Sequence, residues 1–181
     1  MNKKFAAFRK GRIFSTMRAQ ANPIMRPDMN RLLFLCTGNY YRSRFAEILF
    51  NSLASRYRLD WQADSRGLAL DLTGGNVGPM ANVACESLVM KGIRCTSMQR
   101  FPMPVSPADF QTADLIVALD EKEHRPMMRE RFPVWENQIV YWLIHDLDLW
   151  AAETALPAIE SHVNQLANEL RENPALAGKA K

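Results

Sequence analysis

The chain has 181 residues, of which 48% are hydrophobic, and a formal net charge of +4. This length and apolar content can form the core of one compact domain and leave room for an extension. No apolar run reaches the roughly 18 to 20 residues that a membrane-spanning helix requires, so we expect no membrane span.

The net positive charge lies at the N-terminus. Residues 1–31 contain eight Lys/Arg and one acid, Asp28, whereas the other 150 residues contain fifteen bases and eighteen acids. With Phe5, Phe8 and Phe14 among its bases, this leader has the composition of a transit peptide or of a membrane-surface arm. We favour a simpler interpretation, a flexible extension, and expect no nucleic-acid binding because the short arm lacks an aromatic platform. The expected extension, domain and C-terminal tail are residues 1–29, 30–172 and 173–181.

Apolar runs alternate with amphipathic stretches along the rest of the chain. This pattern predicts an α/β fold, a three-layer sandwich in which a four-stranded parallel sheet has helices on both faces. The predicted strands are residues 31–36, 61–65, 114–119 and 138–144. Helical spacing places one buried face on Ala46, Leu49, Phe50, Leu53 and Tyr57. Ser106 before Pro107 predicts the start of a short helix, and apolar residues from Ile159 to Leu170 predict a terminal helix with Pro157 in its first turn or at a bend.

The segment Cys36-Thr37-Gly38-Asn39-Tyr40-Tyr41-Arg42 directly follows the first predicted strand and precedes a helix. Such a loop aligns backbone N–H groups and the positive end of the helix dipole around one point, which suits a tetrahedral oxyanion. The same field favours the nucleophilic thiolate of Cys36, and Arg42 can grip two phosphoryl oxygens. Gly38 would permit the positive φ of a tight turn, and Ser43 could donate a hydrogen bond to the sulfur. The alternative is a small buried cysteine at a strand end.

Three cysteines, Cys36, Cys85 and Cys95, form neither a C-x2-C pair nor an even-numbered secreted framework. A reducing cytoplasm suits a working thiol, so we expect a cytoplasmic protein. Each histidine lacks metal-ligand spacing and is expected at the surface or in a loop; the three are His124, His145 and His162. We therefore expect no metal site and no cofactor.

Leu35-Cys36-Thr37-Gly38-Asn39, followed by Arg42-Ser43 and Ala46-Glu47, resembles the signature of the low-molecular-weight protein tyrosine phosphatases. This family shares its fold with thioredoxin-coupled arsenate reductases, and the resemblance covers roughly residues 30–172. Trp61 and Asp64-Ser65 look like the family's second strand and the variable loop beside the pocket. The resemblance therefore places Trp61 and Ser65 at the pocket rim or in contacts that support it. It implies metal-independent hydrolysis of a phosphotyrosine protein or a small aryl phosphate.

A cysteine-dependent phosphatase needs an acid that protonates the leaving oxygen. Ligands of open parallel sheets lie beyond the carboxyl ends of the strands, where Cys36, Ser65, Asp120 and Asp146 are expected. Asp146 and Asp148 compete for the role of the acid. The family places an Asp-Pro pair here, and counting from the aromatic residue of the preceding strand selects Asp146, although the proline is replaced by a leucine.

Other positions depart from the family pattern. Tyr40 and Tyr41 stand where relatives carry a small or aliphatic residue and a second cysteine, so the two rings could stack on an aryl phosphate or pack against a neighbouring loop. Without that second thiol, Cys36 is expected to be more exposed to overoxidation. Arg44 replaces a frequent proline, and Ser97 replaces a histidine that braces the asparagine of the loop. These changes put rate and specificity in question more than reaction type.

Two other functions stay open at this point. Arsenate reduction uses a similar loop but needs further thiols, and the stretch after the third strand, residues 119–124, contains none. Cys85 and Cys95 fall in and after the second helix, where a buried small residue is the ordinary explanation. The other alternative is a catalytically weakened module that binds phosphate or a phosphoprotein, as the altered loop and the missing Asp-Pro pair would allow.

Overall fold

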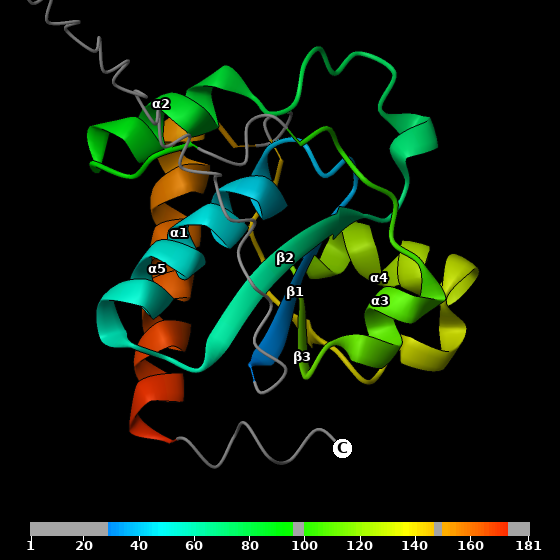
Figure 1. The fold of residues 1–181 in the computed structure, drawn as a ribbon. Coiled ribbons are helices and arrows are strands. Elements are labelled where there is room, and N and C mark those ends of the chain that lie inside the picture. Colours follow the sequence, from blue (N-terminus) through cyan, green and yellow to red (C-terminus); the bar gives the residue numbers. More distant parts are fainter. Residues whose placement is uncertain (1–28, 96–99, 147–149, 174–181) are drawn as a thin grey trace, which may run out of the picture.

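The structure is a computed structural model that describes residues 29–95, 100–146 and 150–173. Strands and helices alternate along the chain (Figure 1). The strands are β1 (Asn30–Cys36), β2 (Trp61–Gly67), β3 (Leu115–Ala118) and β4 (Val140–Tyr141). The helices are α1 (Arg42–Tyr57), α2 (Asn82–Met90), α3 (Pro107–Thr112), α4 (Glu121–Arg131) and α5 (Ala152–Glu172), with short 3-10 helices η1 (Leu70–Leu72) and η3 (Pro133–Trp135). None of the described helices is long and apolar enough to cross a membrane.

The four strands form one parallel sheet in the order β2-β1-β3-β4. This arrangement confirms the predicted four-stranded parallel sheet and its fold class. The register pairs Cys36 with Gly67 and Leu35 with Ala118, so the carboxyl ends of the central strands meet at one edge. The fourth strand is shorter than the predicted 138–144, because β4 is an edge strand whose ladder with β3 covers only Val140 and Tyr141.

Apolar side chains on both faces of β1 explain the three layers. Because side chains alternate along a strand, Leu32 and Phe34 face one side and Leu33 and Leu35 the other, and all are at least 96% buried. The first pair packs with α1, α2 and α5, and the second with α3 and α4 (Figure 1). Helices on both faces hold the central strand in place up to its last residue, Cys36.

Local sequence signals account for several helix boundaries. Ser106 and Asp109 form the reciprocal capping contacts expected at the start of α3, with Ser106 N donating to Asp109 Oδ2 at 2.8 Å. The predicted face of α1 is buried except for Tyr57, which is only partly covered. Pro157 lies in the second turn of α5 rather than in its first, because the helix already begins at Ala152.

Candidate active site

The loop between β1 and α1 closes one end of a cavity of about 150 Å³. Cys36 is the last residue of β1 and Arg42 the first of α1, so the two chemically active groups are held by regular structure on either side of the loop. The segment after β2 and the segment after β4 supply the other walls. The cavity is lined by Cys36, Gly38, Tyr40, Tyr41, Arg42 and Asp146, together with Thr73, Asn76 and Ala81.

The sulfur of Cys36 lies 3.0 Å from the hydroxyl oxygen of Ser43. The Ser43 oxygen also accepts a hydrogen bond from Asn39 Nδ2 at 3.1 Å. With one lone pair of Ser43 engaged in this way, its own proton is available to the sulfur. The pair can therefore stabilise a thiolate at Cys36.

Asn39 provides the sharp turn of the loop. Its φ of 49° lies in the left-handed region, which asparagine tolerates better than most residues. The side-chain amide is buried and bonded at both ends: Nδ2 donates to Ser65 Oγ at 2.8 Å, and Oδ1 accepts from Arg100 Nη1 at 3.1 Å and from Met103 N at 3.0 Å. These contacts hold the turn from the side opposite to the cavity.

Gly38 does not have the positive φ that the sequence suggested, because Asn39 takes that conformation instead. The reason for a glycine here is space. A Cβ at position 38 would lie 2.8 Å from Thr73 Cγ2 and 3.0 Å from Asn76 Nδ2. The glycine thus lets the loop approach the segment that follows β2.

The guanidinium of Arg42 is almost completely buried and is bonded to two carboxylates. Nη1 lies 2.8 Å from Glu123 Oε2 and donates to the carbonyl of Ile144 at 3.2 Å, while Nη2 lies 2.7 Å from Asp146 Oδ2. Burial disfavours the charge, but the neighbouring Cys36, Glu123 and Asp146 outweigh it and raise the pKa of Arg42 above its ordinary value. Arg42 stays cationic at the cavity.

Glu123 was not singled out by sequence reasoning. It lies in the first turn of α4, where it also accepts a hydrogen bond from the Thr37 hydroxyl of the loop. Burial raises its pKa, but the contacts with Arg42 dominate and the net pKa is below the ordinary value. Its position shortly after β3, at the carboxyl edge of the sheet, is the only signal that could have identified it.

Asp146 is the described acidic residue that lines the cavity. Its side chain is 38% exposed, so a substrate can reach the carboxylate while it contacts Arg42. Asp148 and the leucine at position 147 lie outside the described residues. The choice between the two aspartates thus stays a prediction from the sequence.

The two loop tyrosines differ in position. The Tyr40 hydroxyl donates to the carbonyl of Val77 at 2.7 Å, which holds the ring against the neighbouring loop at the cavity wall. Tyr41 is 95% buried in the main core, and its hydroxyl has no hydrogen-bond partner among the described residues. Burial, followed by the charge of Asp146, raises the pKa of Tyr41 to about 12. Tyr41 is therefore a neutral wall of the cavity.

A buried polar cluster supports the loop from below. Glu47 accepts from Ser65 Oγ at 2.5 Å, from Arg100 Nη2 at 2.8 Å and from Arg44 Nη1 at 3.0 Å. Burial lowers the pKa of Arg44 from its ordinary value. Ser65, expected at the pocket rim or in contacts that support it, lies in β2 and contacts the loop asparagine. Ser97 lies outside the described residues. Arg100 braces Asn39 and was not foreseen.

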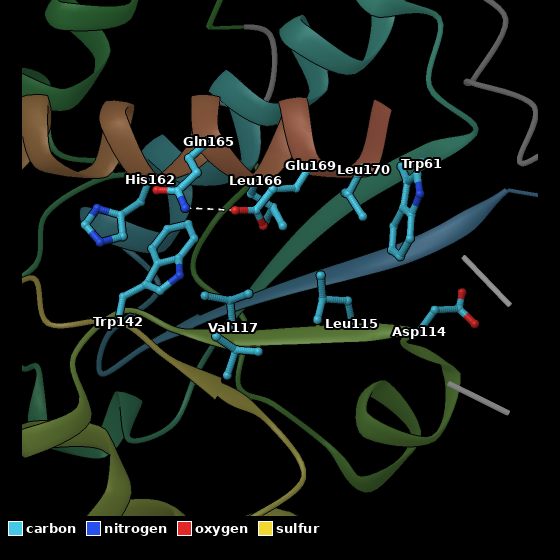
Figure 2. Close-up of a pocket in the computed structure, with 11 residues that line it drawn as sticks. Trp61, Asp114, Leu115, Val117, Trp142, His162, Gln165, Leu166, Glu169 and Leu170 are labelled. Atoms are coloured by element: carbon cyan, nitrogen blue, oxygen red, sulfur yellow. Dashed lines mark hydrogen bonds between the residues drawn. The ribbon is translucent and has the colours of Figure 1, made fainter. Parts of the chain in front are cut away.

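Trp61 was expected at the pocket rim or in contacts that support it, and the structure places it away from the cavity at Cys36. It is the first residue of β2 and pairs with Asn30, at the opposite end of β1 from Cys36. Figure 2 shows it at one end of a different cavity, beside α5. A tryptophan at the start of a parallel strand cannot reach a loop at the carboxyl edge of the same sheet.

His124 is also placed differently from the prediction. It is fully buried on α4, where Nδ1 accepts a hydrogen bond from Asp120 N at 3.0 Å. Burial lowers its pKa to about 3, so the ring is neutral. Asp120 is buried too, with Oδ2 2.6 Å from His145 Nδ1, and does not line the cavity. These residues support the start of α4, and so the position of Glu123.

Comparison with known proteins agrees with this geometry. The family model described as low molecular weight phosphotyrosine protein phosphatase matches residues 31–175. The chain belongs to this family. Membership confirms the resemblance found in the sequence and the prediction of a cysteine-dependent phosphatase, with Cys36 at the position of the nucleophile.

Two curated relatives of this phosphatase cover part of its length. A protein-arginine-phosphatase of Bacillus subtilis (strain 168) is 29% identical over 108 residues, which are 60% of this chain and 67% of the relative. A low molecular weight phosphotyrosine protein phosphatase of Gallus gallus is 30% identical over 105 residues, 57% of this chain and 63% of the relative.

Solved structures show the same fold. YfkJ of Bacillus subtilis has a TM-score of 0.67 at 24% identity, and the match covers 82% of this chain and 98% of that chain. Wzb of Vibrio vulnificus, in complex with benzylphosphonate, has a TM-score of 0.66 at 18% identity, with 78% of this chain and 99% of that chain covered. At these identities the likeness supports the architecture alone.

Proposed function

We propose that this phosphatase hydrolyses phosphotyrosine in proteins, or small aryl phosphates, through a cysteinyl-phosphate intermediate. The observation that carries the proposal is the contact between the Cys36 sulfur and Ser43, 3.0 Å long, in a cavity also lined by Arg42 and Asp146. Nucleophile, anion-binding group and acid then face the same small space. No metal is needed in this mechanism, since Arg42 and backbone amides carry the phosphoryl charge.

In the first step the Cys36 thiolate attacks phosphorus while Asp146 protonates the leaving phenol oxygen. The amides of residues 37–42 and the Arg42 guanidinium hold the phosphoryl oxygens. In the second step Asp146 takes a proton from water, which attacks the cysteinyl phosphate and releases inorganic phosphate. Ser43 donates to the sulfur and so stabilises the departing thiolate.

The pairing of Arg42 with Asp146 gives substrate binding a second effect. A phosphoryl dianion that enters the cavity competes with Asp146 for Nη2 of Arg42. When the anion takes this donor, the carboxylate is released toward the cavity opening, where the leaving oxygen lies. Glu123 keeps its contact with Nη1 and holds the guanidinium in place.

Aromatic phosphate esters suit the walls of this cavity. Tyr40 and Tyr41 both line it, and the fixed Tyr40 ring offers a face to an aryl group. Phosphoarginine is a second candidate substrate, because the Bacillus subtilis relative is a protein-arginine-phosphatase matched at nearly the same identity. Assays with a phosphotyrosine peptide and a phosphoarginine peptide of the same sequence distinguish the two.

Arsenate reduction has less support. Cys95 Sγ donates to the Cys85 carbonyl at 3.4 Å, so these two cysteines lie beside each other on α2 and after it. Neither lines the cavity of Cys36 among its described residues. A titration of thiols with and without arsenate tests this alternative, since a disulfide between Cys36 and either residue would favour the reductase. A free catalytic thiol also supports a cytoplasmic location.

The first experiment is hydrolysis of para-nitrophenyl phosphate at mildly acid pH, in the presence of a chelator and with vanadate as inhibitor. We expect activity that resists the chelator and is abolished in Cys36→Ser, while this variant still binds phosphate or vanadate. Unchanged hydrolysis by Cys36→Ser would remove Cys36 from its role. Binding of phosphate by the wild-type protein without any hydrolysis would instead favour the weakened binding module.

A further inference from the structure

A second cavity lies between α5 and the sheet and begins at the end of β1 opposite to Cys36. Its volume is about 370 Å³, more than twice that of the cavity at Cys36. Figure 2 shows two indole rings at its two ends, Trp61 and Trp142, with apolar residues of β3 below and side chains of α5 above. Val140, which also lines it, is 45% exposed, so the cavity opens to solvent.

The lining combines apolar surface with negative charge. Leu115, Val117 and Leu166 supply aliphatic surface, and Asp114 and Glu169 supply carboxylates. No lysine or arginine is among the described residues that line this space. Glu169 accepts a hydrogen bond from Gln165 at 2.8 Å, and its negative charge is not balanced by that amide (Figure 2). The cavity therefore suits a ligand that carries both apolar and cationic groups.

The leader of this same chain has that chemistry and is attached at the edge of the cavity. Residues 1–28 contain seven Lys/Arg and the single acid Asp28, together with the apolar residues Phe14, Met17, Ile24 and Met25. The chain enters β1 at Asn30, which pairs with the cavity residue Trp61. The next backbone N–H, that of Arg31, donates to Asp114 at 2.8 Å.

The length of the leader also fits. The cavity residues Trp61 and Val117 pair with Asn30 and Phe34 of β1, respectively. Four residues of β1 separate these two pairs, so the cavity extends about 13 Å along the strands. An extended chain covers about 3.3 Å per residue, so about five residues of the leader span this distance and residues 14–26 are more than long enough to line it. Because the segment is tethered, its effective concentration at the cavity is in the millimolar range, and weak contacts suffice for occupancy.

We propose that residues 14–26 of the leader occupy this cavity in their own chain. The apolar side chains of the segment pack between Trp61 and Trp142. Arg18 and Arg26 lie near the carboxylates of Asp114 and Glu169. The occupant is an intramolecular one, and a second copy of the chain or a foreign ligand would be a different result.

Photo-crosslinking in the full chain tests this placement directly. p-Benzoyl-L-phenylalanine replaces Val140, which lines the cavity and is partly exposed, and in a control chain it replaces Val134, which is 67% exposed and lies outside the cavity. After irradiation at low protein concentration, cross-linked peptides are identified by mass spectrometry. We expect cross-links from position 140 to residues 14–26 in the monomer band, and none to these residues from position 134.

Charge gives a second, independent readout. The substitution Glu169→Gln is added to the protein that carries the photo-crosslinker at position 140. It keeps a helix-forming side chain but removes one carboxylate. We expect the yield of the cross-link to fall about two- to fivefold, the effect of one exposed ion pair. Cross-links to a second copy, cross-links to other segments only, or an unchanged yield in Glu169→Gln would each overturn the proposal. The measurement does not depend on hydrolysis, so its result is separate from the test of Cys36.

Discussion

Nη2 of Arg42 and Oδ2 of Asp146 are 2.7 Å apart in the cavity. The group proposed to hold the phosphoryl oxygens and the group proposed to protonate the leaving oxygen are thus paired with each other. In the proposed mechanism the first chemical step needs a proton on this carboxyl group, at the oxygen that contacts Arg42 or at its neighbour. In the same proposed mechanism, binding of the phosphoryl dianion to Arg42 displaces Asp146 from Nη2, which links substrate binding to the position of the acid.

Asp146→Asn is expected to lower kcat for phenyl phosphate by about 10²- to 10⁴-fold, the usual contribution of a general acid. The loss should be smaller for para-nitrophenyl phosphate, because nitrophenolate leaves without full protonation. Phosphate and vanadate should bind more tightly to the variant, since Arg42 loses a competing carboxylate. Steady-state kinetics with both esters and inhibition constants for vanadate measure these effects.

Asp148→Asn is the matched control for this prediction, as the other acid proposed from the sequence. We expect its kcat to change by less than about threefold, a small effect compared with loss of a general acid. A larger loss in Asp148→Asn than in Asp146→Asn would reassign the acid to position 148.

Arg100→Ala should weaken the phosphate loop without touching the cavity. The variant loses the bond to Asn39 at 3.1 Å and the ion pair with Glu47 at 2.8 Å, and the left-handed turn at Asn39 loses a brace. Hydrogen bonds to charged groups contribute about 1.5–3 kcal/mol, so we expect kcat/KM to fall about ten- to hundredfold. Arg129→Ala, which removes an arginine of α4 that is 68% exposed and paired with Glu136, is the control and should be nearly silent. Equal losses in both variants would refute a specific role of Arg100.

Local patterns made the fold and the loop predictable. Residues 32–35 form a continuous apolar run, which is typical of a strand covered on both faces, and α1 shows helical periodicity. The order of these elements could therefore be predicted from short stretches of sequence. The loop itself is a contiguous motif. The family resemblance added Asp146 as the candidate acid, and this residue lines the cavity.

The supporting contacts could not be predicted because they join distant segments. Glu123 is 81 residues from Arg42, and Arg100 is 61 residues from Asn39. A polar side chain on a short helix or in a loop carries no periodic signal that distinguishes a buried ion pair from a solvated one. Trp61 was misplaced for a related reason, since its distance from the loop depends on the parallel register and not on its membership of β2.

His124 predicts a pH dependence of stability. Burial depresses its folded-state pKa to about 3 from an ordinary value of 6.5, so the unfolded chain binds more protons between these values. The free energy of unfolding should therefore fall as the pH drops from about 6.5 toward 3, by up to about 1.4 kcal/mol per pH unit from this residue.

Urea unfolding of the wild type and of His124→Asn at several pH values measures this slope. Asparagine can still accept from Asp120 N but does not titrate. We expect a flatter dependence in the variant over the same window. Parallel slopes in the two proteins would show that His124 does not cause the loss at acid pH.

Tyr41→Phe is expected to stabilise the protein. The Tyr41 hydroxyl is buried and has no hydrogen-bond partner among the described residues, and such a group costs about 1–3 kcal/mol. Phenylalanine keeps the ring in the core and removes the unpaired oxygen, so the free energy of unfolding should rise by about 1 kcal/mol. Because a neutral wall takes no part in proton transfer, kcat and its pH profile should stay unchanged. A less stable variant would mean that this hydroxyl forms a hydrogen bond in solution. A shift of the acid side of the kcat–pH profile would mean that it also helps to position Asp146, whose charge contributes to the raised pKa of Tyr41.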